Sequence, residues 1–261
     1  MSKQPPTCNL AGLSVLVTRP EHQSEGLCDL IQSAHGRPVR FPALEILGPT
    51  DKKAARTQLE GIKRADLLIF VSANAVQYAF PLLPEQLPFD IDIAAVGGAT
   101  AAALAARGLE PTLVPQRMDS EGLLALPALN AVAGKSIYIL RGNGGRELLS
   151  DTLRERGAEV RQVEVYRRQI PKRRAAAANL VRGWEQLVNA VVATSNVIVD
   201  NLFTLVGDEG AERLRSTPIV VVSQRMAEYV ISRGCESVYV AGSASDLDVL
   251  TTLCEVNEDV A

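Results

Sequence analysis

The sequence predicts an α/β protein in which parallel β-sheets are covered by α-helices on both faces. Short runs of β-branched and aliphatic residues, such as DLLIFVS (66–72) and NAVVATS (189–195), alternate with amphipathic segments along the whole chain. Successive residues within these runs are apolar, which is typical of strands that are buried on both faces of a parallel sheet. With 261 residues, 47% of them hydrophobic, the chain can build one large domain or two ordinary ones.

In the first half of the chain, each expected strand leads into an expected helix. SVLVTRP (14–20) is a short apolar run that ends at a proline, and the helical pattern after it stops at Gly36. RPVRFPALEI (37–46) is expected to be extended and to be interrupted by its two prolines. The other expected elements are strands at 66–72, 92–97 and 111–115, and helices at 52–63, from about 74, at 99–107 and from about 120.

The second half of the chain repeats this alternation. We expect strands at 135–142, 189–195, 218–223 and 237–242, with a long extended segment at 158–169. Helices are expected at 146–156, at 175–186, from about 196, at 225–233 and at the end of the chain. Gly157 and Gly234 each follow one of these helices, and glycine commonly ends a helix in the left-handed conformation.

The two halves resemble each other in the order and spacing of their motifs. VLVTRP aligns with IYILRG, IFVSANAV with VATSNVIV, and AVGGATAAALAARGLEPTLV with VVVSQRMAEYVISRGCESVYV. The separations are 122, 123 and 126 residues, measured from Arg19 to Arg141, Ser72 to Ser195 and Gly108 to Gly234. We interpret this as a duplicated unit, with the alternative that unrelated α/β units share their spacing for common physical reasons. The repeat alone would divide the chain near residue 130.

Charge and rare residues argue against several classes of function. The net charge is −3, and the one basic cluster, RRQIPKRR (167–174), is expected to be a solvated linker, with a nucleic-acid patch as the alternative. Four scattered cysteines without a CxxC spacing and only two histidines argue against a zinc site and a histidine-dependent nucleophile. The N-terminal segment has no apolar signal region, so we expect a cytoplasmic protein with reduced thiols and no membrane association.

Small and polar residues follow the expected strands at the points where helices begin. Ligands of open parallel sheets bind beyond the carboxyl ends of the strands, where helix N-termini offer unpaired N–H groups to an anion. Hydroxyl and amide side chains there can cap a helix or bind a ligand, and arginines can hold a carboxylate or phosphate. The candidate binding residues are Thr18, Arg19, Ser72, Asn74, Gly97, Thr100, Arg141, Gly142, Arg146, Ser195 and Ser223.

Each candidate also has an ordinary structural interpretation. The three serines of the set are suited to cap helices, and Arg19 is equally compatible with a surface position. RGNGGRE lacks the Lys-Ser/Thr of a P-loop, and the glycine pair after the strand at 92–97 lacks the third glycine of a dinucleotide fingerprint. Tyr166, in VEVYRR, is either an ordinary buried tyrosine or, in a cleft, a neutral hydrogen-bond donor.

Taken in order, VLVTRP, FPALEI, IFVSANAV, AVGGATAAAL, ILRGNGGRELL and VEVYRR resemble the uroporphyrinogen-III synthase family over nearly the whole chain. The resemblance implies two Rossmann-like or flavodoxin-like α/β lobes joined by a two-stranded extended connector. Lobe one would comprise residues 1–41 and 168–261, lobe two residues 44–165, and the connectors residues 40–46 and 163–170. The loop VVSQRMA departs from the Gly-x-Thr loop of many relatives, so Ser223 or Arg225 would take over a role of that threonine.

The resemblance also implies an activity in haem biosynthesis, that of a cyclising hydro-lyase. The substrate would be hydroxymethylbilane, a linear tetrapyrrole with carboxylates on every ring, which loses its terminal hydroxyl as water and closes with ring D inverted to give uroporphyrinogen III. Tyr166 would be the catalytic donor or acid, and the strand-end candidates of both lobes would hold opposite ends of the substrate.

The same resemblance implies that no cofactor or metal is needed. It predicts a monomer that binds no nucleic acid, and it allows a transient contact with hydroxymethylbilane synthase. Two alternatives stay open at this point. One is a two-lobed module that binds a small anion without turnover, and the other is a phosphosugar or nucleotide-sugar enzyme that uses RGNGGRE as its phosphate loop.

Overall fold

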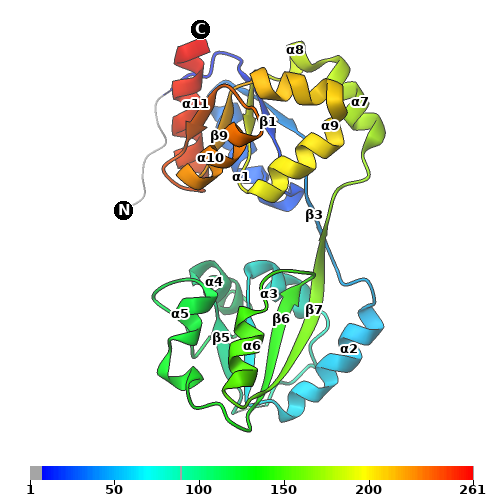
Figure 1. Cartoon of the computed structure of the whole chain (residues 1–261), viewed down its shortest axis with the longest axis vertical. Helices are drawn as coiled ribbons and strands as arrows, with labels where there is room; N and C mark the ends of the chain where they lie inside the picture. Colours follow the sequence, from blue (N-terminus) through cyan, green and yellow to red (C-terminus); the bar gives the residue numbers. More distant parts are fainter. Residues whose placement is uncertain (1–7, 89, 261) are drawn as a thin grey trace. The chain divides into compact units, whose positions relative to one another are not determined.

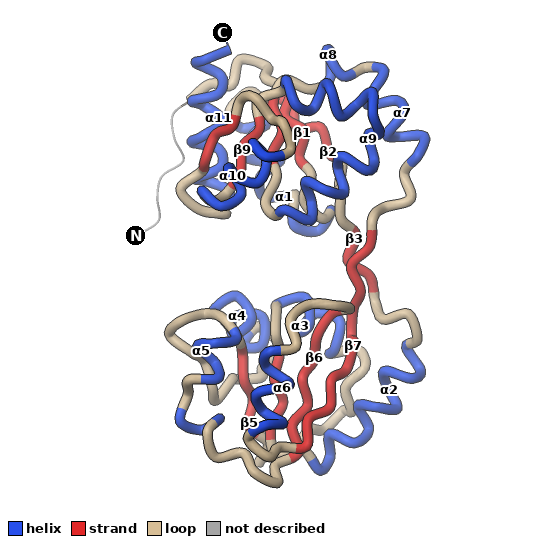
Figure 2. The backbone as a smooth tube through the Cα atoms, in the orientation of Figure 1, coloured by secondary structure: helices blue, strands red, loops and turns tan. Residues whose placement is uncertain are grey.

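The computed structural model describes residues 8–88 and 90–260, which form two compact units (Figure 1). Unit 1 contains the described chain up to Glu45 and again from Gln169 onward, and unit 2 is the continuous segment Ile46–Arg168. Figure 2 shows the strands of each unit flanked by helices, and this confirms the predicted α/β class with two lobes. The unit boundaries fall within β3 (Glu45–Leu47) and β7 (Glu159–Gln169), which are hydrogen-bonded neighbours in one sheet.

The sheet of unit 1 has the order β10-β9-β8-β1-β2, and its strands run parallel. Its strands are β1 (Ser14–Val17), β2 (Arg37–Arg40), β8 (Ala190–Val192), β9 (Ile219–Val221) and β10 (Val238–Val240). The three central strands are buried at every position, as their continuous apolar runs predict. Val15 of β1 lies opposite Pro38 of β2 on one side and Ala190 of β8 on the other.

Helices cover both faces of this sheet. One hydrophobic core joins Leu16, Val191 and Val221 to helices α7 to α10, and a second core packs the alternate strand residues against α1 and α11. The helical segments of unit 1 are η1 (Glu21–Gln23), α1 (Glu25–Ser33), α7 (Arg174–Arg182), α8 (Trp184–Leu187), α9 (Asn196–Ser216), α10 (Gln224–Ser232) and α11 (Asp246–Val260).

Unit 2 repeats this layered arrangement around a sheet of order β3-β7-β6-β4-β5. Besides β3 and β7 the strands are β4 (Leu67–Phe70), β5 (Asp92–Ala95) and β6 (Ser136–Gly142). Its helical segments are α2 (Lys52–Glu60), η2 (Gly61–Arg64), α3 (Ala73–Ala79), α4 (Gly98–Ala105), α5 (Ser120–Leu124), η3 (Pro127–Leu129) and α6 (Leu148–Glu155). Helices α2 to α4 share one core with the sheet, and α5 and α6 share the other.

Three expected elements differ from the structure for local reasons. The strand expected at 111–115 is reduced to a single bridge between Leu113 and Ala94, since two prolines remove backbone donors from this short segment. The helix expected at 175–186 is divided at Gly183 into α7 and α8. The helix expected from residue 146 begins at Leu148, because Gly144 and Gly145 before it have positive φ angles of 66° and 103°.

The strands that align between the two halves of the sequence occupy matching places in the two sheets. The order β9-β8-β1-β2 in unit 1 corresponds to β5-β4-β6-β7 in unit 2. The bridge at Leu113 lies beside β5 as β10 lies beside β9. The two halves of the sequence repeat do not coincide with the two units, because β1 and β2 belong to the same sheet as β8 to β10.

Cys8 and Cys254 are joined as a disulfide, so the expectation of reduced thiols is wrong for this pair. Their Cα atoms are 6.1 Å apart, within the range that a disulfide spans. The two cysteines are 246 residues apart in sequence, and they meet because α11 packs beside α1 near the start of unit 1. Cys28 and Cys235 are free and buried, and burial raises the pKa of both thiols.

The disulfide should stabilise the oxidised protein only. We expect Cys254→Ser to lower the free energy of unfolding by about 2–4 kcal/mol under oxidising conditions, because the cross-link restricts the unfolded chain over a long loop. Thermal melting of the variant and the parent, each with and without reductant, checks this. In reductant the two should melt alike. The expectation would be contradicted if reductant did not change the melting temperature of the parent protein. It would also be contradicted if all four cysteines of the parent were alkylated without prior reduction.

Candidate functional site

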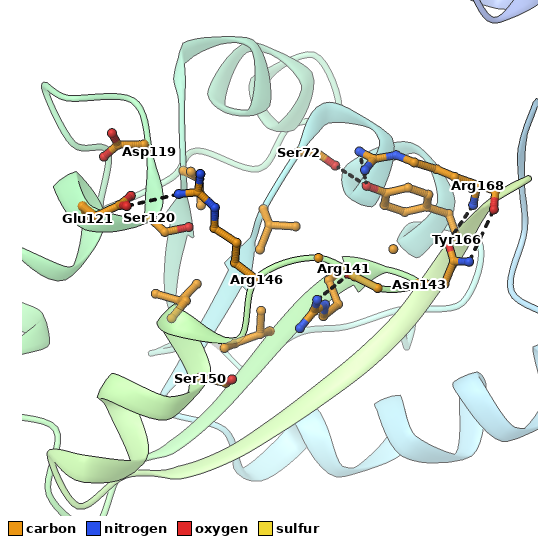
Figure 3. Close-up of a pocket in the computed structure, with 17 residues that line it drawn as sticks. Ser72, Asp119, Ser120, Glu121, Arg141, Asn143, Arg146, Ser150, Tyr166 and Arg168 are labelled. Carbon is orange, nitrogen blue, oxygen red and sulfur yellow. Dashed lines mark hydrogen bonds and ion pairs between the residues drawn. The ribbon is translucent and has the colours of Figure 1, made fainter. Parts of the chain in front are cut away.

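A pocket of about 310 Å³ opens in unit 2 beyond the carboxyl ends of β4, β5 and β6 (Figure 3). Its wall combines the loop after β6, the start of α5, the end of β4 and two side chains of β7. Five of the residues predicted from the sequence line it, namely Ser72, Arg141, Gly142, Arg146 and Tyr166. The location is the one that the parallel-sheet rule predicts for a ligand.

The loop Asn143-Gly144-Gly145-Arg146 gives the pocket its backbone donors. Gly144 and Gly145 both have positive φ angles, a conformation that side chains other than glycine rarely adopt. In the part of the chain that the structure describes, the N–H groups of Gly144, Gly145 and Arg146 donate to no protein acceptor. Free amides that line a concave loop are well suited to hold an anionic oxygen.

Gly142 brings the tyrosine of β7 against the end of β6. A Cβ atom at this position would lie 2.5 Å from the ring of Tyr166, so a larger residue would displace the ring. The β6–β7 register also shifts between Arg141 and Gly142, a bulge that breaks the regular pairing. Gly142 therefore positions the Tyr166 ring, and its role as a binding residue stays a prediction.

Tyr166 is 2% exposed, with its ring in the apolar core and its hydroxyl at the pocket. The hydroxyl lies 3.2 Å from the Oγ of Ser72 and accepts a hydrogen bond of 3.1 Å from Nη2 of Arg168. The Arg168 guanidinium also lies over the ring, 5.5 Å from its centroid. In Figure 3 Arg168 and Ser72 both point toward the tyrosine hydroxyl. The phenol has one proton to donate, and either hydroxyl can be the donor in the hydrogen bond between Tyr166 and Ser72.

Arg168 was not predicted from the sequence as a site residue. It lies two residues after Tyr166 on the same strand, and residues two apart on a strand point to the same face. The two-residue spacing from Tyr166 was the sequence signal that could have identified Arg168 as a site residue. Ser72 has its structural interpretation confirmed, because it caps α3 by accepting from the N–H of Ala75 at 3.1 Å. It also lies beside the tyrosine, and its role in binding a ligand stays a prediction.

Arg141 is 8% exposed, and its guanidinium is engaged inside the protein. It donates to Oε1 of Glu147 at 2.8 Å and also to the Gln162 side chain and the Gly144 carbonyl. Hydrogen bonds from Gln162, Ser150 and Arg141 lower the pKa of the Glu147 carboxyl, which keeps it an acceptor. Three of the five N–H groups of the Arg141 guanidinium are therefore engaged by protein acceptors, which lets Arg141 support the glycine loop, and its contact with a ligand carboxylate stays a prediction.

Arg146 is an exposed cation of the pocket, with 73% of its side chain accessible. It forms an ion pair of 3.2 Å with Glu121 in α5, and Figure 3 shows the guanidinium extended toward that helix. Asp119 caps α5 by accepting from the N–H of Gly122 at 2.7 Å. That bond, together with Arg117, lowers the pKa of the Asp119 carboxyl. Asp119 and Glu121 were not predicted, because α5 joins the pocket only through tertiary packing.

The other predicted residues of unit 2 lie outside this pocket. Asn74 is in the first turn of α3, and Thr100, only 4% exposed, is in the first turn of α4. Gly97 caps α4 and lies against Met118, whose Cβ would be 3.3 Å from an added Cβ. The N–H of Gly98 in turn donates to the Met118 sulfur at 3.4 Å. The start of α4 is thus covered by a flexible side chain.

The predicted residues of unit 1 have internal partners at the carboxyl ends of β1, β8 and β9. Thr18 is fully buried and donates to the carbonyl of Val192 at 2.6 Å. Arg19 forms an ion pair with Asp246 and donates to the carbonyl of Ala244 at 3.1 Å. Ser195 and Ser223 cap α9 and α10, each accepting from the N–H three residues ahead at 3.3 Å.

Two general properties of the described chain bear on the site. No group of three or more His, Cys, Asp or Glu side chains within residues 8–88 and 90–260 is arranged to hold a metal ion. Over the same residues, no helix combines the length and the apolar character that crossing a bilayer requires. The polar groups that line the pocket are backbone amides, guanidinium groups, three serine hydroxyls, a tyrosine hydroxyl, the Asn143 amide and the carboxylates of Asp119 and Glu121.

Comparison with known proteins identifies the family of the chain. Residues 25–250 match the family model described as uroporphyrinogen-III synthase HemD. The chain is 35% identical over 246 residues to uroporphyrinogen-III synthase of Escherichia coli (strain K12), which covers 92% of this chain and 100% of that protein. It is 32% identical, with the same coverage, to the uroporphyrinogen-III synthase of Salmonella typhimurium.

Solved structures agree in fold. A mutant uroporphyrinogen III synthase from the extremely thermophilic bacterium Thermus thermophilus superposes with a TM-score of 0.67 at 20% identity, covering 95% of this chain and 100% of that one. The Helicobacter pylori protein superposes with a TM-score of 0.59 at 15% identity and the same coverage. The family model and the curated relatives, each matching most of the chain, show that it belongs to the uroporphyrinogen-III synthase family.

Proposed function

We propose that this protein is a uroporphyrinogen-III synthase that converts hydroxymethylbilane to uroporphyrinogen III, acting as a cyclising hydro-lyase. The terminal hydroxyl leaves with one proton as water, and a carbon–carbon bond closes the ring with ring D inverted. Family membership supports the activity. The observation that carries the chemistry is the pocket of unit 2, where free backbone amides, Arg146 and the Tyr166 hydroxyl occur together.

The donors of the pocket suit the carboxylates of the substrate. The amides of Gly144, Gly145 and Arg146 offer hydrogen bonds without side-chain reorganisation, and the Arg146 guanidinium can exchange Glu121 for a substrate carboxylate. An exposed ion pair contributes about 0–1 kcal/mol, so this exchange is easily driven. When its carboxylates are held in this way, the flexible bilane presents one ring D carbon to the attacking carbon in preference to another. Positioning of the substrate would thus select isomer III over isomer I.

We assign Tyr166 the role of hydrogen-bond donor or acid to the departing hydroxyl. The phenol oxygen accepts from Arg168, and in its hydrogen bond with Ser72 either hydroxyl can donate, so the phenol proton can be directed to the leaving group. Arg168 is exposed and covers the ring, and a substrate carboxylate that attracted its guanidinium would uncover the hydroxyl. Arg168 would then act on both the substrate and the tyrosine.

The remaining predicted residues contribute through their backbone in this proposal. Thr18, Arg19, Ser195 and Ser223 keep their internal partners and leave the helix N-termini of unit 1 to bind carboxylates. Asn74, Gly97 and Thr100 would act in the same way in unit 2, with Met118 displaced. We further propose that the enzyme works as a cytoplasmic monomer without a cofactor.

The proposed activity is checked by product analysis. Freshly made hydroxymethylbilane is supplied to the protein, the products are oxidised, and the isomers are resolved by chromatography. We expect isomer III to predominate, because the enzyme outpaces the spontaneous closure to isomer I. Isomer I alone, in the same proportion as in a reaction without protein, would disprove the activity.

Tyr166→Phe should reduce turnover by about 10²-fold or more while leaving KM nearly unchanged, since it removes a donor but keeps the ring that fills the core. The fraction of isomer I should rise as the spontaneous reaction competes. Steady-state kinetics with isomer analysis measures both effects. Tyr138→Phe is the matched control, because that buried hydroxyl accepts from Arg161 at 2.7 Å outside the pocket. Equal kinetics of Tyr166→Phe and the parent would remove the assignment.

Arg146→Ala should raise KM by about 5- to 100-fold, corresponding to about 1–3 kcal/mol for a lost charged hydrogen bond, with little change in kcat. The matched control is Arg154→Ala, an exposed arginine of α6 that pairs with Asp151 and does not line the pocket. A fall in kcat at constant KM would indicate instead that Arg146 acts in the transition state only.

A further inference from the structure

A second cavity of unit 2, of about 670 Å³, lies between the start of α2 and the end of α3. None of its lining residues lines the pocket described above. A stacked pair of aromatic rings lies between the two cavities. Tyr78 lines the second cavity and stacks on Tyr166, which lines the first. The two ring centroids are 6.1 Å apart, with an interplanar angle of 28°. A ligand in the second cavity would therefore lie one aromatic ring away from the Tyr166 side chain.

The interior of the second cavity is apolar and aromatic. Leu82 is 6% exposed, Pro49 is buried and Tyr78 is half-buried. The Tyr78 hydroxyl donates to the carbonyl of Ile46 at 2.5 Å, so its hydrogen-bonding need is met inside the protein. The Tyr78 ring can therefore pack against a ligand. Arg167 of β7 holds the carbonyl of Gly48 at 2.8 Å and so fixes one wall. This interior suits a flat ring.

The rim of the cavity is basic. Lys52, Lys53 and Arg56 of α2 all line the cavity and are exposed. Arg56 is a helical neighbour of both lysines, four residues after Lys52 and three after Lys53. Within residues 8–88 and 90–260, none of the three forms an ion pair with an acidic side chain, and no acidic residue lines the cavity. The neighbouring Asp51 is engaged as the cap of α2, accepting from Ala54 at 2.8 Å.

This charge distribution differs from that of the first pocket. There the exposed Arg146 is paired with Glu121, whereas here three cations surround an apolar interior without a counter-charge among the described residues that line it. Arg56 makes one internal hydrogen bond, to the carbonyl of Pro81 at 3.2 Å, and this ties α2 to the end of α3 across the rim. A partner of complementary chemistry needs a flat apolar body and at least one negative charge at its edge.

We propose that the cavity between α2 and α3 is a binding site for an organic anion composed of an aromatic ring and a carboxylate. The ring lies against Tyr78 and Leu82, and the carboxylate reaches the ammonium and guanidinium groups of Lys52, Lys53 and Arg56. The site goes beyond the proposed function, since it needs no turnover and uses none of the residues assigned to the reaction.

The test is titration of the ¹⁵N-labelled full chain with indole-3-propionate, followed by amide chemical shifts. We expect saturable shifts at Gly48, Gln77 and Leu82, and binding at least about tenfold weaker for the neutral analogue indole-3-propanol. Replacing Lys52 and Arg56 together by alanine should weaken binding of the acid by about tenfold or more, and Lys53→Glu should do the same. Lys63→Ala, at an exposed lysine of unit 2 that lines neither of these two cavities, is the matched control.

Each contrary outcome overturns the proposal. Shifts confined to Asn143–Arg146 would place the anion in the first pocket. Equal affinity for the acid and the alcohol would leave an apolar cavity without preference for charge. No saturation up to about 10 mM would mean that the cavity does not bind this class of molecule. Isomer analysis of the same variants separates this result from the proposed function, because hydroxymethylbilane conversion should be retained whichever way the titration turns out.

Discussion

The arrangement of the pocket depends on the close approach of the Tyr166 ring to the backbone of Gly142. Only a residue without a Cβ lets the ring lie across the end of β6, where an added carbon would be 2.5 Å away. That contact places the phenol oxygen beside Ser72 and under the Arg168 guanidinium. It also coincides with the register shift between β6 and β7, after which the chain enters the glycine loop. The tyrosine, the loop and the cap of α3 are therefore linked through one steric constraint.

Around this contact the protein separates rigid supports from groups that are free to bind. Arg141 and Glu147 satisfy each other beneath the loop, whereas the amides of Gly144 and Gly145 stay available above it. Arg146 and Arg168 are exposed and held by weak partners that a carboxylate can replace. Arg141 is buried and bonded inside the protein, whereas Arg146 is exposed. The two arginines therefore have different roles, although both belong to the motif RGNGGRE. The distinction follows from burial and hydrogen bonding, which the motif does not encode.

The fold and part of the site could be predicted because their causes are local in sequence. Runs such as AVV in β8 are buried on both faces, and Ser72, Ser195 and Ser223 cap the helices that their positions predicted. Asp119 and Glu121 were missed because α5 reaches the pocket only through packing. The disulfide was missed because its cysteines are separated by nearly the whole chain. Arg141 and Arg146 were predicted as site residues and line the pocket, whereas Arg168 was missed. Which acceptors each arginine meets depends on neighbours such as Gln162, which lies 21 residues from Arg141.

The position of β1 inside its sheet, between β8 and β2, affects how the chain can fold. Its partner β8 lies more than 170 residues away, so pairing them directly would close a very long and entropically unfavourable loop. The inserted segment Ile46–Arg168 carries its own sheet, and the strands at its two boundaries, β3 and β7, are hydrogen-bonded neighbours. Once the inserted segment has folded, its two ends are held together and the effective loop becomes short. Early folding of unit 2 would thus favour the pairing of β1 with β8, and a substitution that disrupts the pairing of β3 with β7 would slow the assembly of a sheet to which unit 2 contributes no residue.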